Sequence, residues 1–148
     1  MVRRRFALAF APFALLACAG NAAAATLAVT KTASCGCCAH WVEHMKKAGF
    51  TVTVRNVEDV GPTARRLAVP AKLRSCHTAE IEGYAIEGHV PAADVKRLLA
   101  QRPKAAGLAV PGMVMGSPGM EHGDHKEPYQ VILFDKAGAT KVYASHNQ

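Results

Sequence analysis

The chain has 148 residues, a length typical of a single domain, and half of them are hydrophobic. Its formal net charge is +7, yet beyond residue 5 no run of Lys or Arg is longer than two. Basic residues scattered in this way give no support for a nucleic-acid-binding protein.

The first 25 residues have the three parts of a secretory signal peptide. A basic start, MVRRR, precedes the apolar run FALAFAPFALLA, whose roughly 12 residues are too few to span a membrane. The alanine-rich AGNAAAAT then offers a cleavage site after Ala25. We therefore expect residues 1–25 to be removed and residues 26–148 to form the mature domain, without a transmembrane span. Cleavage would leave 15 basic residues against 11 acidic ones.

A competing processing signal lies inside the same segment. Residues 15–18, LLAC, are similar to a lipobox, in which Cys18 would become a lipidated N-terminus. Leu16 fits that motif poorly, and an ordinary cleavage site follows directly. We therefore favour a free exported protein, with the lipoprotein as the alternative.

The mature chain predicts alternating strands and helices. Residues 26–32 and 50–57 have the β-branched, alternating pattern of strands. Residues 37–49 predict a helix with Trp41, Val42 and Met45 on its buried face and a glycine at its end. Further along we expect a short helix over 60–67, a strand-like segment over 80–90, a helix over 91–101, a brief apolar segment from 107, and a closing hairpin of strands 129–134 and 140–144.

This order of elements is typical of an α/β, thioredoxin-like domain with a mixed central sheet flanked by helices. The cysteine-rich stretch TASCGCCAHW falls at its first strand-to-helix junction. In the thioredoxin layout a cis proline lies against the cysteine motif. By that analogy we expect Val110–Pro111, before the closing hairpin, to be the cis peptide bond.

Three cysteines crowd into four positions at the start of the predicted helix: Cys35, Cys37 and Cys38. The mature chain has one more, Cys76, so two disulfides would require two clustered cysteines to bond to each other. The positive end of a helix lowers the pKa of a cysteine and favours the thiolate. Thiolates bind Cu(I), Zn²⁺ or iron–sulfur clusters, and three sulfurs so close together suit a polynuclear copper–thiolate cluster better than a tetrahedral zinc ion.

Histidines and methionines offer further ligands for a soft metal. Cys76 is followed by His77, and both side chains could reach one site. Met113 and Met120 lie in a Gly/Pro-rich segment where an apolar core role and a thioether ligand role are equally plausible. Other histidines have competing explanations: a solvated pair for His40 and His44, a capping or supporting role for His89, and no role for His146 in the tail.

In combination, the motifs CGCC followed by Trp, SCHTA, GYAIEGHVP, GLAVPGM and GSPGME resemble the exported CopG-type copper-resistance and metal-binding proteins. The resemblance covers nearly the whole mature chain. It implies a thioredoxin-like fold, a periplasmic location and a copper cluster with several ions on the C-x-C-C cysteines. Carried over residue by residue, it implies metal ligation by Cys35, Cys37, Cys38, Cys76, His89 and Met113.

Three functions follow from these patterns. The leading hypothesis is a periplasmic copper-binding protein of copper homeostasis, which binds Cu(I) and also cycles its redox state, working with other periplasmic copper-handling proteins. The alternative is a thiol–disulfide oxidoreductase that uses Cys35 and Cys38 as the attacking and resolving thiols. A structural zinc protein fits the sulfur spacing poorly.

Overall fold

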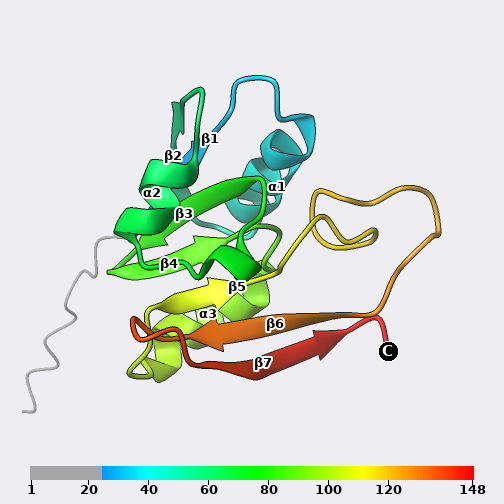
Figure 1. The fold of residues 1–148 in the computed structure, drawn as a ribbon. Helices are drawn as coiled ribbons and strands as arrows, with labels where there is room; N and C mark the ends of the chain where they lie inside the picture. Colours follow the sequence, from blue (N-terminus) through cyan, green and yellow to red (C-terminus); the bar gives the residue numbers. More distant parts are fainter. Residues whose placement is uncertain (1–24) are drawn as a thin grey trace, which may run out of the picture.

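A computed structural model describes residues 25–148 of the chain (Figure 1). The predicted signal peptide up to residue 24, including Cys18, lies outside the described residues. The elements in chain order are β1 (Thr26–Lys31), α1 (Gly36–Lys47), β2 (Thr51–Asn56), α2 (Gly61–Arg66), the 3-10 helix η1 (Ala71–Leu73), β3 (His77–Ile81), β4 (Tyr84–Glu87), α3 (Ala92–Gln101), β5 (Gly107–Ala109), β6 (Tyr129–Phe134) and β7 (Thr140–His146).

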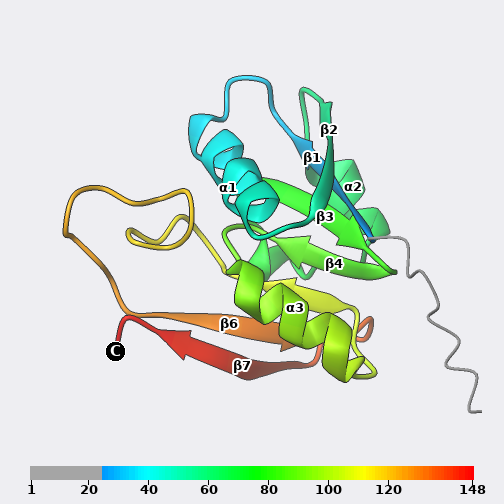
Figure 2. The same ribbon diagram turned by 180° about the vertical axis from the view of Figure 1, so that it is seen from behind.

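All seven strands join one mixed sheet in the order β2-β1-β3-β4-β5-β6-β7. Strand β1 pairs in parallel with β2 and antiparallel with β3, and β3 pairs antiparallel with β4. Helices α1 and α3 cover one face of the sheet, while α2 lies on the other (Figures 1 and 2). The predicted thioredoxin-like α/β class, with a mixed central sheet flanked by helices, is confirmed.

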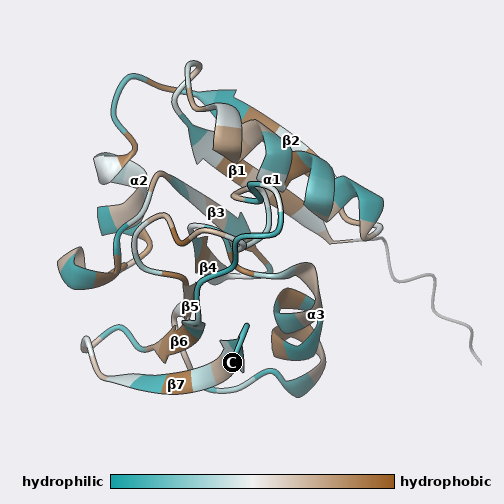
Figure 3. Cartoon of the chain, turned by 90° about the vertical axis from the view of Figure 1, so that its right-hand side faces the viewer, coloured by the Kyte–Doolittle hydropathy of each residue, from teal (hydrophilic) through white to brown (hydrophobic). Residues whose placement is uncertain are grey.

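Each face of the sheet has its own hydrophobic core. The face under α1 and α3 buries Trp41, Met45 and Leu98 among the strand residues, and the Trp41 indole Nε1 donates a hydrogen bond to the Val90 carbonyl oxygen at 2.9 Å. The smaller core under α2 and η1 is closed by Leu73 and Phe134. In Figure 3 α1 and α3 carry both hydrophobic and hydrophilic stretches, as expected of helices with one buried face.

The segment 80–90 differs from the prediction of a single strand. Glu82 and Gly83 both have positive φ, 47° and 83°, and the residues beside them, Ile81 and Tyr84, are paired across the sheet. This is a two-residue hairpin turn of the kind that requires left-handed backbone at both positions. The alternating apolar residues therefore belong to two antiparallel strands, β3 and β4.

The expectation of a cis proline is wrong. Among residues 25–148 there is no cis peptide bond, and Val110–Pro111 is trans. The analogy took β6–β7 as the hairpin nearest the cysteine motif, but the antiparallel hairpin next to β1 is β3–β4, and β6–β7 lies at the far edge of the sheet. The segment that enters β3 carries Cys76 to the other cysteines. Within the described part of the chain, no helix is both long and apolar enough to cross a membrane.

The pairing of β4 with β5 predicts the effect of a single methyl group. Gly107 lies opposite Ala85, and a Cβ at Gly107 would overlap the Ala85 carbonyl oxygen. We expect Gly107→Ala to lower the free energy of unfolding by about 2 kcal/mol or more, since overpacking against backbone cannot relax cheaply. Denaturant unfolding followed by circular dichroism measures this.

The matched control is Gly36→Ala, because a Cβ at Gly36 meets nothing within 4 Å. At the first position of α1 alanine should leave stability unchanged or raise it slightly. Equal stability of the two variants would contradict the close approach of β4 and β5.

Candidate metal centre

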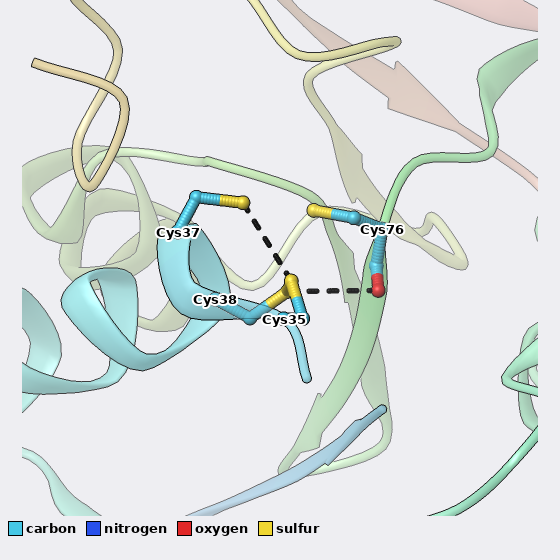
Figure 4. Close-up of side chains that lie close together, drawn as sticks. All are labelled: Cys35, Cys37, Cys38 and Cys76. Carbon is cyan, nitrogen blue, oxygen red and sulfur yellow. Dashed lines mark hydrogen bonds between the residues drawn. A yellow bond between two sulfur atoms is a disulfide. The ribbon is translucent and has the colours of Figure 1, made fainter. Parts of the chain in front are cut away.

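Strand pairing brings the distant cysteine to the cysteine cluster. Strand β1 ends at Lys31, whose partner on β3 is His77, the first residue of that strand. The chain leaves β1 toward α1, where Cys35 is the residue before the first helical turn. The residue before His77 therefore lies at the same edge of the sheet as the head of α1. Figure 4 shows the Cys76 side chain extending toward the first turn of that helix.

The four sulfur atoms of Cys35, Cys37, Cys38 and Cys76 all lie within 4.8 Å of one another. The sulfurs of Cys35 and Cys37 are 3.6 Å apart, and the Cys38 sulfur lies 3.7 Å from the Cys76 carbonyl oxygen (Figure 4). Cys38 is buried, whereas the other three are partly exposed. The gathering of the four predicted cysteines at one place is thus a property of the fold.

Two of these cysteines are bonded to each other. Cys35 and Cys38 form a disulfide at the N-terminus of α1, and Cys37 and Cys76 are free thiols. The positive end of the helix stabilises a thiolate that is released when such a disulfide is reduced. The described state is therefore the oxidised one, and four cysteine ligands become available only after reduction.

A second group of potential ligands adjoins the first through Cys76. One nitrogen of His77 and one of His89 lie with the Cys76 sulfur within 4.8 Å of one another. The Cys76 sulfur is 3.1 Å from His89 Nε2 and 3.5 Å from His77 Nδ1. His89 Nδ1 is 2.8 Å from the Pro118 carbonyl oxygen, which can only accept, so Nδ1 carries the proton. The lone pair on His89 Nε2 therefore faces the cysteines, in the orientation that a metal ligand requires.

Burial controls the charge of this second group. Burial, followed by the nearby Cys37, raises the pKa of the Cys76 thiol to about 11. Burial, followed by the neighbouring His89, lowers the pKa of His77 to about 3, and burial also lowers the pKa of His89. At neutral pH the metal-free site thus contains a protonated Cys76 and two neutral imidazoles.

The donor set fits a soft cation. Sulfur and neutral imidazole are the ligands that copper and zinc prefer in proteins. His77 Nε2 is buried and has no hydrogen-bond partner, which is uncommon for a buried polar atom. A positive ion near these groups would reverse the effect of burial on Cys76 and favour its thiolate.

Met113 is placed differently from the cysteines and His89. It lies in the segment after β5, and the residue is 58% exposed. The Ser75 hydroxyl donates a hydrogen bond to the carbonyl oxygen of Gly112 at 2.5 Å, so the backbone beside Met113 is attached to the Cys76 segment. The structure therefore holds the Met113 backbone close to the segment of Cys76, and the residue itself is exposed.

Two further histidines, His44 and His146, form hydrogen bonds within the fold. His44 Nε2 accepts a hydrogen bond from the backbone N–H of Ala92, the first residue of α3, at 3.2 Å, and His40 is exposed. The expectation of an idle tail at His146 is wrong, because its ring stacks on Tyr129 and its Nε2 lies 2.7 Å from an Asp94 carboxylate oxygen.

Sequence reasoning missed two residues that lie beside the site. Gly119 has a φ of +84°, and a Cβ there would lie 2.6 Å from the Trp41 backbone nitrogen and 2.8 Å from the Cys37 carbonyl oxygen. Its segment, GSPGM, thus packs directly on the cysteine-bearing turn, which the two glycines around a proline could have signalled. The other is Glu87, a buried carboxylate that no local pattern distinguishes from an exposed one.

The chain is a thiol-rich member of the thioredoxin-like fold class. Four cysteines and two buried histidines gather at the head of its first helix.

A family model described as "Protein of unknown function, DUF411" matches residues 73–120. Comparison with curated proteins gives no match. Two solved structures, both of copper resistance protein CopG, are 43% identical to the chain with a TM-score of 0.79. They cover 82% and 83% of this chain and 98% of their own. The chain therefore belongs to the CopG family, as the sequence motifs predicted.

The neutral His77 predicts a dependence of stability on pH in the metal-free protein. Its pKa is about 3 when folded and about 6.5 when unfolded, so the unfolded chain binds the proton first. The contribution of neutral His77 to the free energy of unfolding is fully present above pH 6.5. It is lost as pH falls toward 3, by about 1.4 kcal/mol per pH unit.

We expect His77→Phe, which keeps an aromatic ring against Trp41, to weaken this decline. Denaturant unfolding at a series of pH values between 7 and 4 provides the measurement. Identical slopes for the wild type and the variant would show that His77 is not held neutral by the fold.

Proposed function

We propose that the chain is an exported copper-binding protein of copper homeostasis or resistance, acting in the periplasm after residues 1–25 are removed. Membership of the CopG family supports a copper-related role. The observation that carries the proposal is the convergence of four cysteine sulfurs within 4.8 Å of one another. Copper-handling proteins of the same compartment are the partners that this role implies.

Cu(I) is the proposed cargo, bound by Cys35, Cys37, Cys38 and Cys76 as thiolates. The Cys35–Cys38 disulfide must first accept two electrons and two protons from a dithiol reductant, which becomes a disulfide in turn. The thiols then lose their protons to solvent as metal binds. Because a thiolate sulfur can bridge two metal ions, four sulfurs so close together support several ions per chain.

His89 and Met113 complete the proposed ligand set. His89 presents the lone pair of Nε2 to the site, since the Pro118 carbonyl oxygen holds the proton on Nδ1. Met113 is an exposed residue whose thioether is a soft ligand suited to Cu(I). Unlike a thiol, a thioether cannot be lost to disulfide formation. An exposed methionine suits the arrival or departure of copper better than its retention.

The same residues support redox cycling of copper. When two Cu(II) ions meet the reduced pair, the Cys35 and Cys38 thiols can give up two electrons and two protons as their disulfide forms. The electrons convert the two ions to Cu(I), and the protons go to solvent. Cys37 and Cys76 keep their thiols in this step.

One observation favours a second candidate function, a thiol–disulfide oxidoreductase. The disulfide spans a C-x-x-C spacing at a helix N-terminus, which is the arrangement that such enzymes use. Against this, the Cys37 sulfur is only 3.6 Å from that of Cys35 and would compete with Cys38 as the resolving thiol.

Titration of the reduced mature domain with Cu(I) under anaerobic conditions tests the copper proposal. We expect more than one ion per chain, all four thiols protected from alkylation, and an affinity at least about ten-fold lower in Cys37→Ser and Cys76→Ser, since each loses a ligand. The measurement is competition with a chromophoric Cu(I) chelator.

Ser34→Ala is the matched control, because it changes an exposed residue next to the cluster without touching a sulfur. We expect its stoichiometry and affinity to equal those of the wild type. A wild-type domain that retains no copper would contradict the proposal.

Reduction of insulin by dithiothreitol separates the second candidate from the first. A copper-binding protein should accelerate it little, and Cys37→Ser should raise the rate by removing the competing thiol. Turnover comparable with a dedicated oxidoreductase, abolished in Cys38→Ser and unaffected by Cu(I), would favour the enzyme.

A further inference from the structure

We propose that Glu87 is a positioning residue that holds Cys76 in the metal centre. The hydrogen bonds of its side chain go to Ser75 and Thr78, the residues on either side of the Cys76–His77 pair. The inference rests on the copper-binding function proposed above.

The carboxylate of Glu87 spans the Cys76–His77 pair. Glu87 is the last residue of β4, and only 1% of its surface is exposed. One oxygen, Oε1, accepts a hydrogen bond from the Ser75 backbone N–H at 2.7 Å. The other, Oε2, accepts a hydrogen bond from the Thr78 hydroxyl at 2.6 Å. Its two partners are therefore the residue before Cys76 and the residue after His77.

Cys76 needs such support because the sheet does not provide it. The paired register of β1 with β3 ends at Lys31 and His77, and that of β4 with β3 ends at Glu87 and Thr78. Beyond those pairs the Gly88 N–H donates to the His77 carbonyl oxygen at 3.0 Å. The Ser75 N–H lies outside the ladder, and the Glu87 side chain takes the place of the absent strand partner.

A buried carboxylate is a costly way to satisfy one backbone N–H group. Burial raises the pKa of Glu87, and the hydrogen bonds from Thr78 and Ser75 oppose that effect. An apolar residue would complete the smaller core on this face of the sheet without a desolvation cost. What the carboxylate provides in return is the attachment of the backbone on both sides of the Cys76–His77 pair, which Ser75 Oγ reinforces through its hydrogen bond to the Gly112 carbonyl oxygen. Residues outside a metal site that orient its ligands alter metal affinity by about 10- to 100-fold when they are changed.

The test compares two substitutions of Glu87 with a matched control. Glu87→Leu removes both hydrogen bonds at similar volume. Glu87→Gln keeps an acceptor for Ser75, and the Thr78 hydroxyl can turn to accept from the amide. The control is Asp94→Asn, which alters another buried carboxylate with two hydrogen-bonded partners, Arg97 on α3 and His146 at the end of β7.

The first readout needs no metal. The reduced protein is treated with iodoacetamide, and the alkylation rates of Cys76 and Cys37 are resolved by peptide mass spectrometry. We expect Glu87→Leu to speed alkylation of Cys76 by about ten-fold relative to Cys37, because the freed segment exposes a thiol that burial protects. Glu87→Gln should stay within about three-fold of the wild type, and Asp94→Asn should match it.

The second readout is Cu(I) affinity by chelator competition. We expect a loss of about ten-fold in Glu87→Leu, at unchanged stoichiometry, with near-complete rescue in Glu87→Gln. If Glu87→Leu does not fold, Thr78→Val decides the matter, because it frees one oxygen of Glu87 and should shift both readouts in the same direction by a smaller factor.

The two proposals can fail separately. A wild type that binds no Cu(I) refutes the copper function, while the alkylation rates still report whether Glu87 holds Cys76. Equal alkylation of Cys76 in Glu87→Leu, Asp94→Asn and the wild type would overturn the positioning role. So would an increase of the same size in Glu87→Leu and Asp94→Asn, since that would reflect lost stability alone.

Discussion

Antiparallel hydrogen bonding between β1 and β3 places Lys31 opposite His77, and the gathering of the cysteines depends on this register. The chain turns from the end of β1 into the cysteine-bearing helix, and it enters β3 directly from Cys76. A shift of one residue would move every side chain of β3 to the other face of the sheet. It would bury Thr78 where His77 now packs on Trp41, whose ring centroid is 4.4 Å from that of His77. The same register that completes the hydrophobic core therefore also assembles the candidate metal centre.

The metal-free site avoids the repulsion that four neighbouring thiolates would create. Two of its sulfurs share a disulfide, and burial keeps Cys76 protonated and the two adjacent imidazoles neutral. Cys76, His77 and His89 thus carry no charge in the metal-free state at neutral pH. A cation entering the site would change this balance, because it would stabilise thiolates that the fold alone disfavours.

Local patterns predicted most of the elements and the residues that gather around Cys76, and non-local pairing accounts for what they missed. The faces of α1 and α3 follow from helical spacing, and the closing hairpin begins where its alternation predicts. The Glu82–Gly83 turn went unnoticed because the apolar alternation continues through it. The wrong expectation of a cis Val110–Pro111 bond had a related cause, since only the strand order shows which hairpin lies next to β1.

The proximity of the four cysteines was predictable from the sequence, whereas the disulfide between two of them was not. Cysteine spacing and family motifs pointed to Cys35, Cys37, Cys38 and Cys76, and the fold brings these four together. No sequence pattern shows that Glu87 is buried, or that His89 is oriented by a carbonyl oxygen some thirty residues away. Such properties arise from contacts between segments that are distant in the chain.

The number of free sulfur donors in the cluster depends on whether Cys35 and Cys38 are joined by their disulfide. The oxidised chain has two free sulfurs in the cluster, Cys37 and Cys76, and the reduced chain has four. Two electrons therefore double the number of sulfur atoms at this place that can donate a lone pair, without any change in the fold that gathers them.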